Sequence, residues 1–311
     1  MTSERYIDQV ALLLRAIPQI APEADFALKG GTAINLFVRD LPRLSVDIDL
    51  VYLPVADRET SLRAVSDGLD RVAERLEARG LKVERHLLAD GKRLIVHSGG
   101  AAIKIEVSPV LRGTVYPPEV RTVVPAVEDR FGFAEMQVVS LPDLYAGKMA
   151  AALDRQHPRD LFDIHHLLSH GGIDEQLFRA FLIYLVSHPR PIHELLAPHC
   201  LDISAQYDAE FVGMTVENES LETLLAARDR LISQAGEMAG ASGSRRFLTS
   251  FLAIEPDWNA AGLSPALAEL PAVRWKLLNL ERLRDANIAK FTSQQLLLDR
   301  YLDDVVRAAR L

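Results

Sequence analysis

One short segment, residues 29–49, holds the residues whose types and spacing indicate chemistry. It begins with a Gly-Gly-Thr turn and ends with an Asp-x-Asp pair; the residues are Gly30, Gly31, Thr32, Asp47 and Asp49. Side chains alternate between the two faces of a strand, so two aspartates two positions apart project from the same face. Adjacent carboxylates repel each other unless a cation lies between them, and the usual cation is a divalent metal such as Mg²⁺.

The glycine turn lies where a strand gives way to a helix. Glycines let backbone N–H groups approach a phosphate, and the N-terminus of a helix attracts negative charge. A phosphate cradle followed by metal-holding carboxylates predicts the transfer of a phosphate-linked group. Each half alone has an ordinary alternative: a common strand-to-helix turn, and two solvated acids on an exposed strand face. Acids are poor strand formers, which makes the second alternative the weaker one.

Composition sets the broad class. The chain of 311 residues is long enough for two domains, and 49% of its residues are apolar, as in ordered globular proteins. A net charge of −8 argues against a protein that coats nucleic acid non-specifically, although a local basic patch would suffice for RNA. No apolar run is long enough to span a bilayer, no signal peptide is evident, and the lone Cys200 fits a reducing compartment. We therefore expect a cytoplasmic protein without membrane association, and favour a monomer.

The first half of the chain alternates between strand-like and helix-like patterns. Asp57 is typical of a helix cap, Gly80 of a helix end, and the pair Asp90-Gly91 of a hairpin turn. The expected strands are residues 25–29, 46–53, 82–88, 93–98 and 102–107, and the expected helices are residues 4–17, 32–38 and 57–80. This order predicts an α/β (α+β) fold, with a small mixed sheet and helices on one side of it.

From Ser140 onward the pattern is helical. A helix starts near Ser140 and ends before Pro158, where a second helix begins. The expected domains are residues 1–139 and a mainly helical domain of residues 140–311. Within the helical domain, the Gly-Ala-Ser-Gly-Ser stretch at residues 240–244 is the strongest candidate for a flexible loop. For Trp258 and Trp275, core packing is favoured over stacking on a base.

The order of these motifs resembles a known family. The run Arg-Leu-Ser-Val-Asp-Ile-Asp-Leu at residues 43–50 is followed downstream by Lys148 and by the run Arg-Asp-Leu-Phe-Asp at residues 159–163. Together they are similar to the AbiEii/AbiGii toxin family of type IV-like toxin–antitoxin and abortive-infection systems, within the DNA polymerase β-type nucleotidyltransferase superfamily. The resemblance covers the first half to two thirds of the chain. It implies a polymerase β-like lobe followed by a mainly helical lobe.

The resemblance also implies an activity. The protein would transfer a nucleoside monophosphate from an NTP to an RNA acceptor, with the tRNA 3′ end as the leading candidate, and so block translation and growth. Mg²⁺, or alternatively Mn²⁺, would be the cofactor, and RNA and a cognate antitoxin protein would be the partners. Three alternatives stay open: nucleotidylation of a protein, nucleotidylation of a small molecule such as an antibiotic, or a binding module that has lost turnover.

Site residues follow from the same resemblance, matched position by position. The nucleotide-binding set is Gly30, Gly31, Thr32, Arg43, Ser45 and Lys148. The catalytic set is Asp47, Asp49, Glu106, Lys148, Asp160 and Asp163, of which Asp47 and Asp49 hold the metal. Ser45 is treated as a nucleotide contact, and the resemblance also makes it a candidate for self-modification. For Arg43, an ordinary surface arginine is an equal alternative.

Three of these assignments have structural alternatives. Glu106 shares a strand face with Lys104 and would supply a third carboxylate, although a solvated strand face has the same pattern. Lys148 lies in a small, apolar helix segment, where it would neutralise the triphosphate or simply extend to solvent. Asp160 and Asp163, three positions apart, share a helix face, where one would orient Lys148 or act as general base. The helix macrodipole alone would account for Asp160.

The acceptor is expected on the helical domain, which would also complete the active site. A candidate basic patch consists of Arg274, Lys276, Arg282, Arg284 and Lys290, with Arg245 and Arg246 as additional members. An ordinary solvated helix face is an equal alternative for this patch.

Overall fold

The computed structural model describes residues 4–88, 91–108, 111–216 and 219–308 and divides into two compact units. The first unit comprises Met1–Ser140 together with Asp208–Glu219, and the second comprises Leu141–Tyr207 together with Ser220–Leu311. The chain thus leaves the first unit near residue 140 and returns to it for one short segment. No sequence pattern indicated this return.

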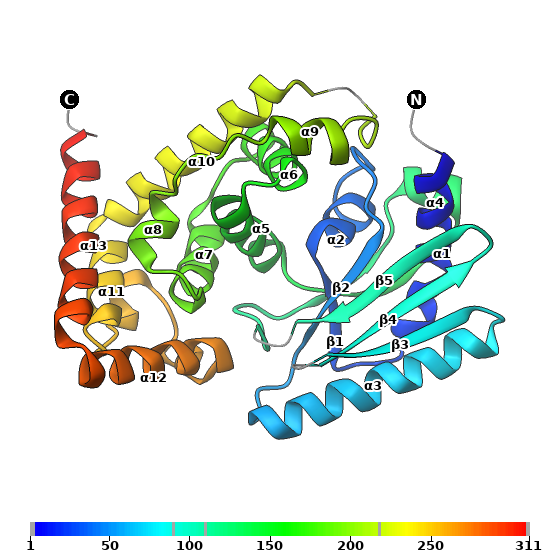
Figure 1. Ribbon diagram of the computed structural model, residues 1–311, viewed down its shortest axis with the longest axis horizontal. Helices are drawn as coiled ribbons and strands as arrows, with labels where there is room; N and C mark the ends of the chain where they lie inside the picture. Colours follow the sequence, from blue (N-terminus) through cyan, green and yellow to red (C-terminus); the bar gives the residue numbers. More distant parts are fainter. Residues whose placement is uncertain (1–3, 89–90, 109–110, 217–218, 309–311) are drawn as a thin grey trace. The chain divides into compact units, whose positions relative to one another are not determined.

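The first unit contains a seven-stranded mixed sheet (Figure 1). Its elements in chain order are α1 (Glu4–Ile20), β1 (Phe26–Lys29), α2 (Gly30–Phe37), β2 (Asp47–Tyr52), α3 (Arg58–Ala78), β3 (Lys82–Leu88), β4 (Gly91–Ser98), β5 (Ala101–Val107), β6 (Glu119–Thr122), α4 (Pro125–Phe131) and β7 (Glu135–Val138). The strand order is β3-β4-β5-β2-β1-β7-β6, with β2 parallel to β5 and antiparallel to β1. The α/β class and the mixed sheet are confirmed; the short strands β6 and β7 had no expected counterpart.

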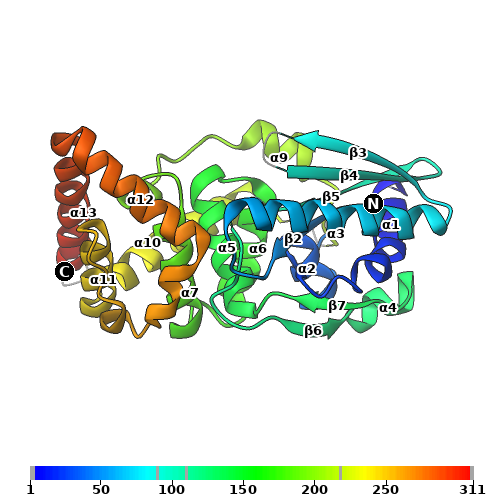
Figure 2. The ribbon, with the colours of Figure 1, turned by 90° about the horizontal axis from the view of Figure 1, so that it is seen from below.

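Local signals account for several of these elements. Asp57 caps α3, because its side chain accepts a hydrogen bond from the backbone N–H of Thr60. The expected hairpin is formed by β3 and β4, paired antiparallel from Lys82 opposite His97 onward. Its expected turn, Asp90-Gly91, lies partly outside the described residues. Helix α3 runs along β3 and β4, and α1 contacts both α3 and β5 (Figures 1 and 2).

The second unit is helical, apart from its connections. Its elements are α5 (Leu141–Arg155), α6 (Pro158–Ser169), α7 (Glu175–Ser187), α8 (Ile192–Leu196), α9 (Ser204–Glu210, which ends in the first unit), α10 (Leu221–Gly240), α11 (Ser242–Leu252), the 3-10 helices η1 (Trp258–Ala261) and η2 (Pro265–Glu269), α12 (Pro271–Ala286) and α13 (Ile288–Ala308). Helix α5 packs against α6 and α7, and α10 packs against α6 and α13. Among the described residues, no helix is both long and apolar enough to cross a membrane.

The expected flexible loop at residues 240–244 is wrong. Helix α10 continues to Gly240 and α11 begins at Ser242, so the two helices are separated by one residue. The glycines serve close packing: a Cβ on Gly243 would lie 2.3 Å from the carbonyl oxygen of Ala260, and one on Gly240 would lie 3.2 Å from Val306. Small residues here allow contact between helices, which composition alone cannot distinguish from chain flexibility.

Candidate active site

Asp47 and Asp49 lie on the face of the sheet opposite to α3. The ring of Phe26 on β1 packs against Gly68 of α3, and Phe26 is in register with Tyr52 of β2. Residues in register share a face, whereas successive residues of a strand alternate. Asp47 and Asp49 are separated from Tyr52 by odd numbers of positions and therefore project away from α3, both half-buried.

The glycine turn lies directly beside these acids. Gly30 adopts a φ of +75°, in the region that favours glycine, and a Cβ there would lie 2.9 Å from Oδ2 of Asp49. A Cβ on Gly31 would lie 2.6 Å from Nη2 of Arg43 and 3.0 Å from Oγ of Ser45. Both glycines are therefore needed for close approach. The turn brings the N-terminus of α2 next to Asp49, Arg43 and Ser45. Lys29, the N-cap residue of α2, makes no capping hydrogen bond with its side chain.

Thr32 and Ser45 tie α2 to the start of β2. The hydroxyls of Thr32 and Ser45 are 3.0 Å apart, and Thr32 Oγ1 also contacts the carbonyl oxygen of Asp47. Both side chains are buried, as is Arg43, whose Nη1 donates to the carbonyl oxygen of Leu44 at 2.9 Å. Arg43 is thus no ordinary surface arginine. The expected hydrogen bonds from Thr32 and Ser45 to a phosphate stay predictions, because here their hydroxyls contact each other.

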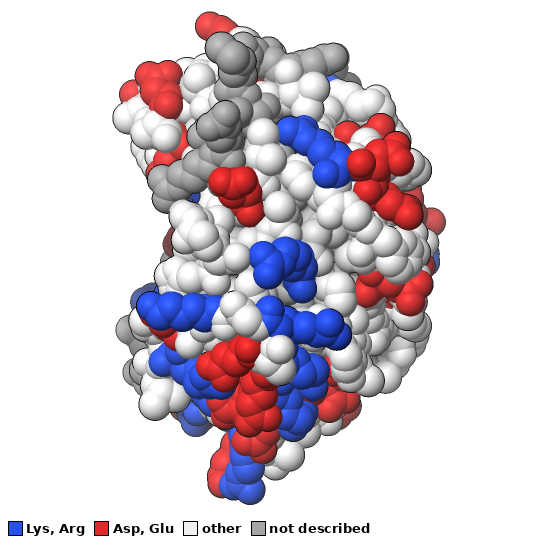
Figure 3. Space-filling model, turned by 90° about the vertical axis from the view of Figure 1, so that its right-hand side faces the viewer, with Lys and Arg blue, Asp and Glu red and all other residues white. Residues whose placement is uncertain are grey.

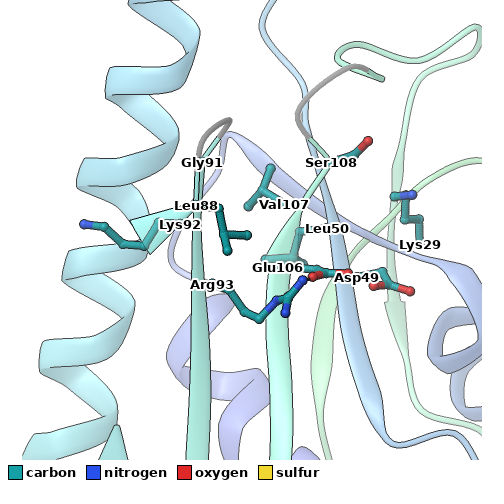
Figure 4. A pocket seen from close by; sticks show the side chains of 10 residues that line it. All are labelled: Lys29, Asp49, Leu50, Leu88, Gly91, Lys92, Arg93, Glu106, Val107 and Ser108. Carbon is teal, nitrogen blue, oxygen red and sulfur yellow. Dashed lines mark hydrogen bonds and ion pairs between the residues drawn. The ribbon is translucent and has the colours of Figure 1, made fainter. Parts of the chain in front are cut away.

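A row of charges crosses four strands of the sheet on this face. The residues in register are Lys29 on β1, Asp49 on β2, Glu106 on β5 and Arg93 on β4. They line a cavity of about 270 Å³, and Figure 4 shows Arg93 and Glu106 directed toward each other, Asp49 directed toward the side of Lys29, and Lys92 pointing away toward α3. Arg93 and Lys29 were not among the site residues expected from the sequence. The Gly99-Gly100 pair, which joins β4 to β5 between the paired residues Ser98 and Ala101, is the signal that would have found Arg93, because a two-residue turn fixes the register of the two strands.

Lys104 and Glu106 form an ion pair on this face of the sheet. Lys104 Nζ donates to Glu106 Oε1 at 2.9 Å, and Arg93 Nε donates to Glu106 Oε2 at 2.9 Å. Burial by itself would lower the pKa of Lys104, but the hydrogen bond to Glu106 and the negative charges of Asp47 and Asp49 outweigh it and raise that pKa. Burial would raise the pKa of Glu106, yet Lys104 and Arg93 outweigh it and lower that pKa. Glu106 is therefore an ionised partner of two cations.

The described acids of this site consist of a pair of aspartates and not of a larger cluster, and such a pair suits a magnesium ion. Within the described part of the chain, no three Asp, Glu, His or Cys side chains gather closely enough to hold a metal ion. Mg²⁺ is commonly held by one or two carboxylates, with water and substrate phosphates as its other ligands. Asp47 and Asp49 meet this requirement. Glu106 as a third carboxylate stays a prediction, because in this structure it pairs with Lys104 and Arg93.

The second unit contains a different cluster of acids around a lysine. Lys148 Nζ on α5 lies 2.7 Å from Oδ1 of Asp160 and 3.0 Å from Oδ2 of Asp163, both on α6. All three side chains are buried, and Arg155 closes the cluster by donating to both carboxylate oxygens of Asp160. Burial alone would raise the pKa of Asp160, but the charge of Lys148 and the hydrogen bond from Arg155 hold it far below its ordinary value. Lys148 thus does not extend to solvent; its expected contact with a triphosphate stays a prediction.

The expected basic patch changes in composition. Lys276 is buried and donates to the carbonyl oxygens of His188 and Arg190, at 2.6 and 3.1 Å, so it stabilises the chain after α7 and is not a surface cation. Trp275, expected in the core, is 54% exposed, and the guanidinium of Arg282 lies 5.7 Å from the centre of its ring. The expectation of core packing is therefore wrong for Trp275, which lies on the surface of α12. Trp258 is buried as expected.

The other expected cations of this patch are partly neutralised. Arg245 pairs with Asp303, Arg246 with Asp257, and Arg284 with Asp285. Figure 3 draws another face, that of the first unit, where basic and acidic side chains also lie side by side. The visible described part of that face therefore carries mixed charge, in keeping with the net charge of −8.

Comparison with known proteins adds the family. The structure is similar to that of MenT4, a nucleotidyltransferase toxin from Mycobacterium tuberculosis H37Rv, with 17% identity, coverage of 94% of this chain and 93% of that chain, and a TM-score of 0.56. At this identity the likeness concerns the fold.

Two further structures are matched with TM-scores too low to carry an argument. They are the polymerase core of TRAMP, an RNA surveillance complex (15% identity, 96% and 86% of the two chains, TM-score 0.26), and the CD-NTase CdnG from Bradyrhizobium diazoefficiens in complex with GTP (14% identity, 99% and 99%, TM-score 0.24). None of the curated protein sequences matches the chain.

The sequence model of the family described as nucleotidyl transferase AbiEii toxin, type IV TA system, matches residues 11–278. This range includes the glycine turn, the aspartate pair and the cluster around Lys148, and it confirms the resemblance found in the motifs. The chain belongs to the AbiEii family of nucleotidyltransferase toxins of type IV toxin–antitoxin systems.

Proposed function

We propose that this toxin transfers a nucleoside monophosphate from an NTP to an RNA acceptor, with Mg²⁺ as cofactor and the tRNA 3′ end as the leading candidate. The observation that carries the proposal is the contact between the glycine turn and the aspartate pair. Gly30 approaches Asp49 so closely that no side chain fits between them. A phosphate at the N-terminus of α2 and a metal on Asp47 and Asp49 would therefore be neighbours.

The residues of the first unit divide the work. Backbone N–H groups at the start of α2 bind phosphate oxygens, and the buried guanidinium of Arg43 adds positive charge beneath them. Asp47 and Asp49 would hold Mg²⁺, and the bound ion would supply Lewis-acid stabilisation of charge on the phosphate and on the attacking oxygen. Lys104 neutralises the acids of this face until the metal and substrate bind.

The reaction is a substitution at the α-phosphorus. The acceptor hydroxyl oxygen forms a bond to the α-phosphorus and loses its proton to water, while the bond to the bridging oxygen of the β-phosphate breaks and pyrophosphate leaves. Modification of a tRNA 3′ end would prevent aminoacylation and so arrest translation and growth. The family implies an antitoxin partner, and we propose that the protein acts in the cytoplasm. The role of Lys148, Asp160 and Asp163 in the reaction stays a prediction, to be tested separately from this site.

Labelling tests the proposal directly. The purified protein is incubated with total bacterial RNA, Mg²⁺ and each α-³²P-labelled NTP in turn. Asp47→Asn, which keeps the shape of the side chain and removes its charge, serves as control, with a melting curve to show that it folds. Label on a tRNA-sized band, lost in the control, is the expected result. Label on protein or on a small molecule would show that RNA is not the acceptor. No label anywhere would contradict the proposal.

A further inference from the structure

The segment that returns to the first unit, residues 211–216, lies against the loop that leads into β2. It follows α9 and precedes α10, more than 150 positions from that loop in the sequence. Phe211, Met214 and Thr215 of this return segment are buried, whereas Val212 and Val216 are exposed. The segment is thus fixed to the unit by three buried side chains.

Backbone hydrogen bonds join the two stretches. The N–H of Leu44 donates to the carbonyl oxygen of Met214 at 2.9 Å, and the N–H of Val216 donates to the carbonyl oxygen of Pro42 at 3.1 Å. These two bonds form an antiparallel bridge that pairs Arg43 with Thr215. Residues 42–46 form no helix or strand of their own, so the bridge is the regular backbone pairing that holds this stretch.

The bridged stretch carries the side chains that contact the glycine turn. Nη2 of Arg43 and Oγ of Ser45 lie against Gly31, at 2.6 and 3.0 Å from the position of a Cβ there. Arg43 is 3% exposed and Ser45 is 8% exposed. A shift of this stretch by even about 1 Å would move both side chains relative to the N-terminus of α2, and binding sites need their side chains held more closely than that.

We propose that the return segment is a positioning element for nucleotide binding: through the bridge between Arg43 and Thr215 it holds Arg43 and Ser45 at the phosphate-binding turn. The inference rests on the proposed function, because it assumes that this turn receives the NTP. Thr215 and Val216 act through the backbone of Pro42 and Leu44 and do not touch the substrate.

Substitution of Val216 tests the bridge with a matched control. Val216→Pro removes the N–H that donates to Pro42, and the residue before a proline favours the extended backbone that Thr215 already has in the bridge. Val216→Ala keeps that N–H and truncates a side chain that is 74% exposed. The loss of one or both hydrogen bonds is expected to weaken NTP binding about five- to tenfold in Val216→Pro and to leave Val216→Ala near wild type.

Two readouts separate the bridge from general stability. The first is the equilibrium binding of each α-³²P-labelled NTP with Mg²⁺, together with KM and kcat for transfer; KM is expected to rise while kcat stays close to wild type, because ground-state positioning is lost. The second is hydrogen exchange of the peptide containing Leu44, which is expected to accelerate in Val216→Pro alone, with unchanged melting temperature.

Each outcome has a distinct meaning. Weaker NTP binding and faster exchange in Val216→Pro, with both unchanged in Val216→Ala, support the positioning role. Wild-type NTP affinity in Val216→Pro overturns it, as does equal weakening in both variants, which would assign the effect to the side chain. A wild-type protein that binds no NTP would refute the proposed function itself, and with it this role, while the exchange experiment would still report on the bridge.

Discussion

Both units of this protein place acidic side chains around a lysine, yet the two arrangements differ in exposure. On the sheet, Lys104 lies among half-exposed carboxylates beside a cavity, with 30% of its side chain exposed. Between α5 and α6, Lys148 lies 7% exposed between Asp160 and Asp163, which are 2% and 1% exposed.

This difference in exposure sets the free energy needed to remove the lysine from its carboxylates. That free energy is small on the sheet and large between the helices. Half-exposed acids can replace a lysine with a metal ion and water at little cost, since solvent still reaches them. Buried acids depend on the lysine, because its removal leaves their charges without compensation in a medium of low polarity. The sheet cluster is therefore accessible to a cation from solvent, and the helical cluster contributes to holding α5 against α6.

The largest expected effect is on the stability of the helical unit. Lys148→Met should lower the free energy of unfolding by about 3–5 kcal/mol, because Asp160 and Asp163 would then be buried without this partner. Lys104→Met, the matched change on the sheet, should lower it by about 0–1 kcal/mol. Urea denaturation of both variants measures the two values. Equal losses would show that the clusters do not differ as their burial indicates.

The acid dependence of stability gives a second, smaller effect at the same cluster. The folded pKa of Asp160 lies below its unfolded value of about 3.9, so its contribution is fully present above that pH and is lost as the pH falls toward the folded value. The free energy of unfolding should therefore fall below about pH 4 in the wild type. The variant Asp160→Asn should start less stable and lose less over the same range. Parallel curves for the two proteins would contradict this assignment.

Ligand binding should depend on the carboxylates of the sheet cluster. Mg²⁺ with an NTP should raise the melting temperature of the wild type, by the equivalent of about 2.7 kcal/mol at a free concentration 100-fold above Kd. Asp49→Asn should abolish the increase, whereas Glu119→Gln, a carboxylate change on the edge strand β6, should retain it. Differential scanning fluorimetry measures the shift. An increase that survives Asp49→Asn would place the ligand elsewhere.

The smallest effect is expected on α12. Trp275 and Arg282 offer an exposed ring and a cation, but Glu269, Glu281 and Asp285 lower the positive charge around them. Trp275→Ala combined with Arg282→Glu should reduce RNA labelling about fivefold, the lower end of base-stacking effects, with KM for NTP unchanged. Arg307→Glu on α13 is the control for a general change of charge. If labelling is unaffected, α12 is not part of the acceptor surface.

Much of the first unit followed from local patterns. Asp57 predicted the start of α3, alternation predicted β2 and β5, and the Gly-Gly-Thr turn predicted the transition from β1 to α2. These features depend on neighbours within a few residues, so the chain signals them locally. The prediction of a flexible loop at residues 240–244 was wrong because it used local composition alone. The glycines there accommodate Ala260 and Val306, which are distant in the sequence.

Register accounts for the site residues that the sequence analysis missed. Arg93 faces Glu106, and Lys29 faces Asp49, only because the strand order places β4 beside β5 and β1 beside β2. Hydrophobic periodicity indicates which face of a strand is buried, but it does not indicate which strand is its neighbour. A residue such as Trp275 shows the same limit, since its exposure depends on which helices cover α12.

The amino-acid sequence by itself determined the order of the motifs, and hence the family, the glycine turn and the shared face of Asp47 and Asp49. These follow from spacing along one strand or one turn, which backbone geometry fixes. Only the tertiary structure decided that Glu106 pairs with Lys104 and Arg93, that Lys148 is buried between two acids, and that residues 211–216 return to the β2 loop. Those contacts join residues far apart in the chain, and their burial sets the cost of removing a charge.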